Sequence, residues 1–163
     1  MHSKLKFWQQ AANQIISLEF EFQTLSEVNA IVAYLDQWFP EKGNVGLGLK
    51  ELMVNAIEHG NLGIGYDFKT KLLRRGVWLQ EVEARILNPK HAEKRAYLRV
   101  KISPSTLKFI IQDQGEGFDV RQFMRQNHDN DLHGRGLLLA KNMAFDKLRF
   151  KNKGSRIEAT VTR

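Results

Sequence analysis

The 163-residue sequence contains no cysteine, only three prolines and no long apolar run. The absence of cysteine excludes disulfides, thiol catalysis and cysteine-based metal sites. No segment reaches the roughly 18 consecutive apolar residues that a membrane-spanning helix needs. The basic residues near Met1 are not followed by the apolar core of a signal peptide. We therefore expect a soluble, cytoplasmic protein with no membrane contact, forming one domain with a sizeable core.

The charge of the chain is strongly basic. Its 25 lysines and arginines outnumber 18 aspartates and glutamates, which leaves a net charge of +7. Such an excess favours acidic partners. The basic residues are scattered, and no basic run is interleaved with aromatic residues that could stack on bases. An acidic protein or a polyphosphate ligand is therefore favoured over direct binding of nucleic acid.

Hydrophobic periodicity divides the chain into helices and strands. Thr24 and Glu27 have the spacing of a capping box and predict the start of a helix that Pro40 ends. Ile110 and the adjacent Ile111 indicate a strand buried on both faces, as in the centre of a sheet. The expected elements are a helix or arm at 1–13, a strand at 17–22, helices at 24–39 and 45–58, one or two helices in 66–85 with a break near residue 76, strands at 96–102 and 106–112, a short helix at 120–124, a helix opened at 134, and strands at 145–150 and 155–162.

The helix expected at 45–58 carries polar residues along one face. Glu51, Asn55 and Glu58 stand at i, i+4 and i+7 and so line up, and His59 and Gly60 follow where a C-cap is expected. A carboxylate can take a proton, and an amide oxygen can ligate a hard cation. The alternative is a solvated face with an ordinary glycine cap. We keep that alternative for Glu58, and we expect His59 to act as a local cap.

Two glycine motifs follow downstream. Asp113–Gly117 comes directly after the central strand, and it offers a carboxylate that could accept a hydrogen bond from an exocyclic amine. Gly134–Gly136 opens a helix, where backbone N–H groups and the helix dipole favour phosphate, and Arg135 adds a cation with forked donors. Each motif alone also fits a turn or a loop end. With the polar helix face, they describe a nucleotide site with adenine, metal and phosphate subsites.

The order of these motifs resembles the ATPase superfamily shared by gyrase, the ninety-kilodalton heat-shock chaperone, histidine kinases and mismatch-repair proteins, the Bergerat fold. Within it, the chain is most similar to the anti-sigma-factor serine/threonine kinases, over roughly residues 14–163. Four motifs carry the likeness: Glu51-x-x-x-Asn55-Ala56-x-x-His59-Gly60 (the N box), Asp113-x-Gly115-x-Gly117-Phe118-Asp119 (the first glycine box), Gly134-Arg135-Gly136-Leu137 (the second), and Gly154-Ser155 where the family has Gly-Thr.

The resemblance implies an α+β fold: a two-layer α/β sandwich in which helices cover one face of a mixed, mostly antiparallel sheet. It implies ATP and Mg²⁺ as cofactors, with Glu51 as the general base and Asn55 as the metal ligand. Asp113 would accept from the adenine amino group. By the same resemblance, Gly115 and Gly117 line the base, Gly134, Arg135, Gly136 and Leu137 bind the phosphates, Ser155 shares the adenine-side hydrogen bonds, and 121–133 form the ATP lid.

The chain departs from the family between the N box and the next strand. About 35 residues intervene, from Asn61 to Arg95, and we refer to 62–95 as the insert. Its helical pattern and exposed-looking Trp78 suggest an added interaction element; a surface helix that packs its own apolar stripe is the alternative. A similar insert occurs in kinase modules fused to phosphatase and receiver domains in bacterial two-component systems.

The leading hypothesis is an ATP-dependent serine/threonine kinase that acts by partner switching. Its expected partners are a sigma factor, an anti-anti-sigma antagonist or a response-regulator module, and the resemblance allows a homodimer. One alternative is a binding module without catalysis. Another is a detached catalytic domain of a histidine kinase, since residues 1–13 are too short for a helical hairpin with its own phospho-acceptor histidine.

Overall fold

The computed structural model describes residues 15–39, 43–117 and 144–163. The expected arm at 1–13, the short helix at 120–124, the lid at 121–133 and the motif at 134–137 lie outside these ranges. The described elements are β1 (Ile16–Phe22), α2 (Leu25–Asp36), α3 (Gly43–Asn55), a π-helix (Ala56–Asn61), α4 (Tyr66–Arg74), α5 (Trp78–Leu87), β2 (Ala96–Ile102), β3 (Thr106–Gln112), β4 (Lys147–Lys151), a 3-10 turn (Asn152–Gly154) and β5 (Arg156–Thr162).

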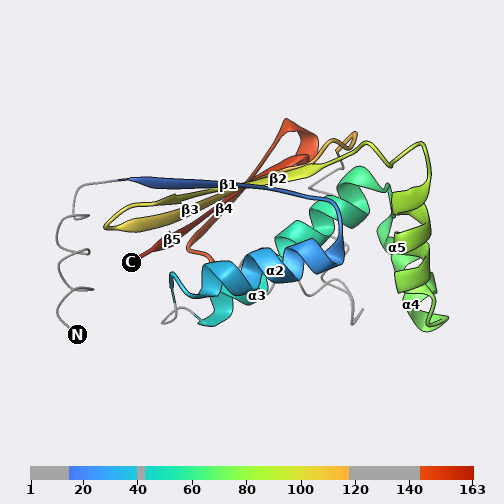
Figure 1. Cartoon of the computed structure of the whole chain (residues 1–163), viewed down its shortest axis with the longest axis horizontal. Coiled ribbons are helices and arrows are strands. Elements are labelled where there is room, and N and C mark those ends of the chain that lie inside the picture. Colours follow the sequence, from blue (N-terminus) through green and yellow to red (C-terminus); the bar gives the residue numbers. More distant parts are fainter. Residues whose placement is uncertain (1–14, 40–42, 118–143) are drawn as a thin grey trace.

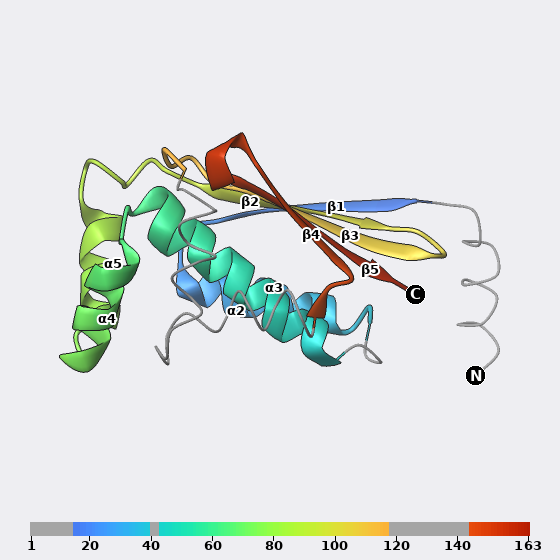
Figure 2. The ribbon, with the colours of Figure 1, turned by 180° about the vertical axis from the view of Figure 1, so that it is seen from behind.

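These elements form the expected two-layer α+β sandwich. The five strands pair in the order β1-β2-β3-β5-β4, and α2 and α3 lie side by side under one face (Figures 1 and 2). All four pairings among the described strands are antiparallel, so this part of the sheet shows no parallel pair of the kind a mixed sheet contains. None of the described helices is long and apolar enough to cross a membrane.

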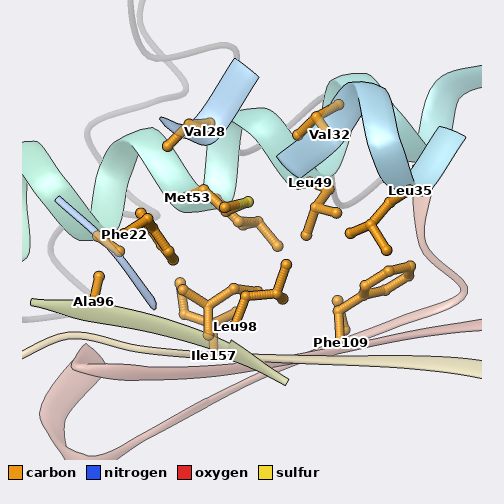
Figure 3. Packing of buried hydrophobic residues seen from close by; sticks show 14 of the residues in the cluster. Phe22, Val28, Val32, Leu35, Leu49, Met53, Ala96, Leu98, Phe109 and Ile157 are labelled. Atoms are coloured by element: carbon orange, nitrogen blue, oxygen red, sulfur yellow. The ribbon is translucent and has the colours of Figure 1, made fainter. Parts of the chain in front are cut away.

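The core lies between the sheet and helices α2 and α3 (Figure 3). Alternate residues of each strand face the helices, and Phe109 on β3 is fully buried opposite Leu35 of α2 and Leu49 of α3. Burial of one such side chain contributes about 1.5–3 kcal/mol. Ile110 and Ile111 are both buried, and β3 lies in the middle of the sheet, as their adjacency predicts.

The capping box is present at the start of α2. The N–H of Glu27 donates to Oγ1 of Thr24 at 3.2 Å, and the N–H of Thr24 donates to Oε2 of Glu27 at 2.9 Å. The hydrogen bonds from the Gln23 and Thr24 backbone lower the pKa of the Glu27 carboxyl. This cap sets where the chain turns from β1 into the helical layer.

The helix expected at 45–58 does not end at Gly60. The α-helical pattern stops at Asn55, and the chain continues as a π-helix through Asn61. Its terminal backbone N–H, at Leu62, donates to the carbonyl of Ile57, and the left-handed glycine that follows is Gly63, with φ +63°. The prediction of a glycine cap at Gly60 is therefore wrong.

The insert forms a helical hairpin of α4 and α5 at one end of the helical layer (Figures 1 and 2). The two helices are separated near Gly76, whose φ of +69° supplies the turn. Trp78 packs against the core, so the expectation that it is exposed is wrong. Phe68, Leu79 and Leu87 remain exposed on the hairpin.

Candidate functional site

Helix α3 presents the two residues expected to carry chemistry. Glu51 and Asn55 are one α-helical turn apart and both are partly exposed, so the i, i+4 spacing places them on one face. Asn55 is the last α-helical residue before the π-helix. Within the described residues, neither side chain forms a hydrogen bond. In this part of the chain, no other residue competes with a ligand for their oxygens.

Glu58 is not a surface residue, and its assignment to a solvated face is wrong. The side chain is fully buried, with Oε2 2.5 Å from Nζ of Lys69 and Oε1 accepting from Nε1 of Trp78. Glu58, in the π-helix, therefore binds to Lys69 of α4 and to Trp78 of α5. Burial raises the pKa of its carboxyl, against the lowering effect of Lys69.

His59 has a structural role, as its assignment to a local cap implies. Its Nδ1 lies within hydrogen-bond reach of the carbonyl oxygen of Ile64, and its ring stacks on Tyr66 with centroids 3.9 Å apart. Burial lowers the pKa of the imidazole to about 4. The ring is therefore neutral near pH 7 and donates through Nδ1 to the chain that enters the insert.

The end of the N box touches the segment that follows β3, here called the β3 loop (113–117). A Cβ added to Gly60 would lie 2.4 Å from Cγ of Asp113, and one added to Gly115 would lie 2.2 Å from the carbonyl oxygen of Gly60. Gly60 therefore leaves room for the Asp113 carboxylate, and Gly115 allows the loop to approach the Gly60 backbone. The structure thus brings together two motifs that are more than fifty residues apart in sequence.

Asp113 is the buried acid of this contact. It is 8% exposed, and its Oδ1 accepts from the N–H of Gly115 at 2.8 Å. Burial raises the pKa of the carboxyl from 3.8 to about 6, against the lowering effects of the Gly115 hydrogen bond and of Lys94. Oδ2 has no hydrogen-bond partner in the described part of the chain. It can therefore accept a hydrogen bond from a ligand.

The Gly154-Ser155 motif lies beside Asp113, as the resemblance implies. The N–H of Asp113 donates to the carbonyl of Ser155 at 3.0 Å, and the Ser155 hydroxyl donates to the carbonyl of Asn152 at 3.0 Å. That hydroxyl keeps its lone pairs as acceptors. Gly117, with φ +81°, packs where a Cβ would lie 2.2 Å from the carbonyl of Lys153. Residues 113–117 and 152–155 therefore form one wall.

Sequence reasoning missed Asn61. Its Oδ1 accepts from the N–H of Gln114 at 2.8 Å, and its carbonyl accepts from His91 and Lys94 of the insert. The available signal was an asparagine directly after His59-Gly60. The Asn61 side chain is buried, and the residue is 3% exposed.

The sequence matches the family model of the histidine kinase-like ATPase domain over residues 23–161. The chain belongs to this family. A search of curated proteins found no significant match. The match spans α2 to β5 and includes the described N box, the β3 loop and the insert. The protein is thus an ATP-binding, histidine kinase-like ATPase domain, and its α+β architecture is consistent with the Bergerat fold.

The described residues fit ATP and its metal. Oδ2 of Asp113 is a buried acceptor of the kind that an exocyclic amine needs. Asn55 offers an amide oxygen, and Mg²⁺ in nucleotide sites is held by one or two protein oxygens together with phosphates and waters. Gly134–Leu137, expected at the phosphates, lie outside the described residues.

Proposed function

We propose that this ATPase domain is a protein serine/threonine kinase of the anti-sigma-factor type. The observation that carries the proposal is the paired presentation of Glu51 and Asn55 on one helical face, next to the contact between Gly60 and Asp113. A wall that contacts the nucleotide is sufficient for ATP binding without phosphoryl transfer. A free carboxylate one turn from a metal-binding amide supports transfer as well.

Each residue has a defined part in the proposed reaction. Asp113 orients ATP by accepting from the adenine amine, and Asn55 holds Mg²⁺, which supplies positive charge at the phosphates. Glu51 takes the proton from the serine or threonine hydroxyl of the substrate protein. The hydroxyl oxygen then bonds to the γ-phosphorus, and the bond from phosphorus to the β,γ-bridging oxygen breaks. ADP leaves with that electron pair.

An acidic protein partner is part of the proposal, and the sheet face opposite the helices supports it. The strand register places seven basic side chains there, against three carboxylates. The basic residues are Arg99, Lys101, Lys108, Lys147, Arg149, Lys151 and Arg156; the acids are Glu19, Glu21 and Glu158.

The acids on this face are already paired with cations. Glu158 is covered by Lys108, Lys151 and Arg156, and the hydrogen bond from Lys151 is the largest contribution that lowers its pKa to about 2. Glu19 pairs with Arg99, and Glu21 with Arg95. In the described ranges, no ion pair involves Lys101, Lys147 or Arg149, so their charge is available to an acidic surface.

The proposed partners are a sigma factor, an anti-anti-sigma antagonist or a response-regulator module. The competing function is ATP-dependent binding of such a partner without phosphoryl transfer. It is favoured if Glu51 is only a solvated surface residue and takes no proton from a substrate. Transfer to a histidine of a separate protein is the other alternative.

One experiment separates these functions. The protein is incubated with γ-labelled ATP, Mg²⁺ and a candidate antagonist from the same cell. The proposal predicts an acid-stable label on serine or threonine of the antagonist. An acid-labile label on histidine would support the histidine-kinase alternative. Tight partner binding with no label would support the binding module.

A further inference from the structure

A chain of hydrogen bonds runs from the insert to the β3 loop, and Asn61 stands at its centre. The side chain of Asn61 is buried, and its Oδ1 accepts from the backbone N–H of Gln114 at 2.8 Å. Gln114 directly follows Asp113. Asn61 therefore restrains the peptide that carries the proposed adenine acceptor.

Asn61 is itself held by the insert. Its carbonyl oxygen lies 2.9 Å from Nδ1 of His91 and 3.2 Å from Nζ of Lys94. A carbonyl can only accept, so His91 carries its proton on Nδ1. The next carbonyl, that of Leu62, accepts from Nη1 of Arg85 in α5 at 2.9 Å. The insert thus holds two consecutive backbone carbonyls, those of Asn61 and Leu62.

The insert also holds the β3 loop directly. The backbone N–H of Arg95 donates to Oε1 of Gln114 at 2.7 Å, so Gln114 is bound through its backbone to Asn61 and through its side chain to the end of the insert. Lys94 lies close enough to lower the pKa of Asp113 electrostatically. The insert also contributes Leu62, Ile64, Leu72 and Val82 to the hydrophobic core, so folding and nucleotide binding must be measured separately in any variant of this network.

We propose that Asn61, held in place by His91, is a positioning residue for adenine recognition, and that the insert is a structural part of the nucleotide site. This inference rests on the proposed role of Asp113. The hydrogen bond between Asn61 and Gln114 fixes the loop peptide. Oδ2 of Asp113 is thereby held in one position relative to the adenine amine. Without that bond, the loop keeps its fold but the acceptor is less well placed, and discrimination between adenine and guanine falls.

The test measures dissociation constants of ATP and GTP by calorimetry for the full chain and for Asn61→Ala, His91→Ala and His91→Asn. An asparagine amide can replace the Nδ1–H donor of histidine, so His91→Asn serves as the conservative rescue. Asn88→Ala is the matched control, because Asn88 accepts from the backbone N–H of Lys90 at 2.9 Å within the insert and does not reach the β3 loop. Thermal unfolding checks that each variant folds.

Asn61→Ala is expected to weaken ATP binding about tenfold or more, since it leaves the N–H of Gln114 without its acceptor. His91→Ala should weaken binding less, since the Asn61 carbonyl loses one of its two donors and keeps Lys94. The preference for ATP over GTP should shrink in both, recover in His91→Asn, and stay unchanged in Asn88→Ala. An unchanged ATP/GTP ratio in Asn61→Ala, even with weaker binding, would show a merely structural role and overturn the inference. If Asn61→Ala does not fold, the comparison of His91→Ala with His91→Asn decides in the same way.

The wild-type measurement separates this inference from the proposed function. If the wild-type chain does not bind ATP, the nucleotide site and the inference both fail. If it binds ATP with a clear preference over GTP, the site stands, and only the variants judge the role of Asn61.

Discussion

Gly60 packs its Cα against the carboxylate of Asp113, so closely that a Cβ at this position would lie 2.4 Å from Cγ of the acid. The contact joins the end of the N box to the loop after β3. It explains why a glycine stands inside the π-helix, where it does not end the helix. The position of the Asp113 carboxylate therefore depends on the lack of a side chain at Gly60.

Gly60→Ala is predicted to weaken ATP binding more than tenfold. The new methyl group must displace the Asp113 carboxylate, and overpacking of this kind also destabilises a fold by about 1–3 kcal/mol. Calorimetry with ATP and urea unfolding measure the two effects. Gly65→Ala is the control, because a Cβ at Gly65 meets nothing within 4 Å and its φ is −69°. Wild-type ATP affinity in Gly60→Ala would contradict the assigned contact.

Glu58→Ala is predicted to lower the free energy of unfolding by about 3 kcal/mol. Breaking a buried ion pair typically costs ~3–5 kcal/mol. The lower end applies because Lys69 is 16% exposed and can reach water once Glu58 is gone. Glu58→Gln keeps an acceptor for Trp78 and should cost less than Glu58→Ala. Urea unfolding gives both values.

Glu81→Ala is the matched control for Glu58. Glu81 pairs with Arg85 at 2.7 Å on the surface of α5, where both side chains are about 30% exposed, and such pairs contribute less than about 1 kcal/mol. Equal losses in Glu58→Ala and Glu81→Ala would show that the buried pair does not fasten the hairpin to the π-helix.

Affinity for ATP is predicted to fall as the pH drops below about 6, where Asp113 takes up a proton. A neutral carboxyl is a weaker acceptor for the adenine amine, so one pH unit below the pKa should cost up to about tenfold. The nucleotide phosphates titrate in the same range. The informative quantity is therefore the difference in pH dependence between the wild-type chain and Asp113→Asn. Identical profiles would contradict the role of Asp113.

Asp113→Asn is predicted to stabilise the fold at pH 7 while weakening ATP binding. Burial raises the pKa of the folded carboxyl to about 6, above its ordinary value of 3.8. The carboxyl therefore contributes stability that is fully present below about pH 4 and is lost as the pH rises through 6. Removing the charge is expected to raise the free energy of unfolding by up to about 3 kcal/mol at pH 7, which follows from the difference between the two pKa values. Urea unfolding of Asp113→Asn at pH 7 and pH 4 tests this: a variant less stable than wild type at pH 7 would contradict the sign.

Much of the sheet could be predicted from local pattern. The strands at 96–102 and 106–112 have the bounds that alternation indicates, and Thr24 and Glu27 start α2 through the expected capping box. These features depend on neighbours within a few residues. The order of the motifs and the family resemblance also predicted that the N box and the first glycine box belong to one nucleotide site, because a resemblance carries long-range information that periodicity lacks.

What the sequence could not show depends on the π-helix and on partners far along the chain. A 3.6-residue period lines Glu58 up with Glu51 and Asn55 and so indicates a polar surface, whereas the side chain is buried against Lys69 and Trp78 of the insert. Burial of Glu58 and of Asn61 follows from contacts with the insert. A helical wheel does not include these contacts with the insert. The sequence alone therefore indicates a surface position for Glu58 and does not show that Asn61 is buried.

Glu51 is the base of the proposed phosphoryl transfer. The most direct test compares Glu51→Ala with the wild-type chain in two assays on one preparation: calorimetric ATP binding, and transfer from γ-labelled ATP with Mg²⁺ to serine or threonine of the candidate antagonist. We predict unchanged ATP affinity and a loss of transfer of at least about a hundredfold, in line with removal of a general base. Transfer by Glu51→Ala at the wild-type rate would contradict the central claim.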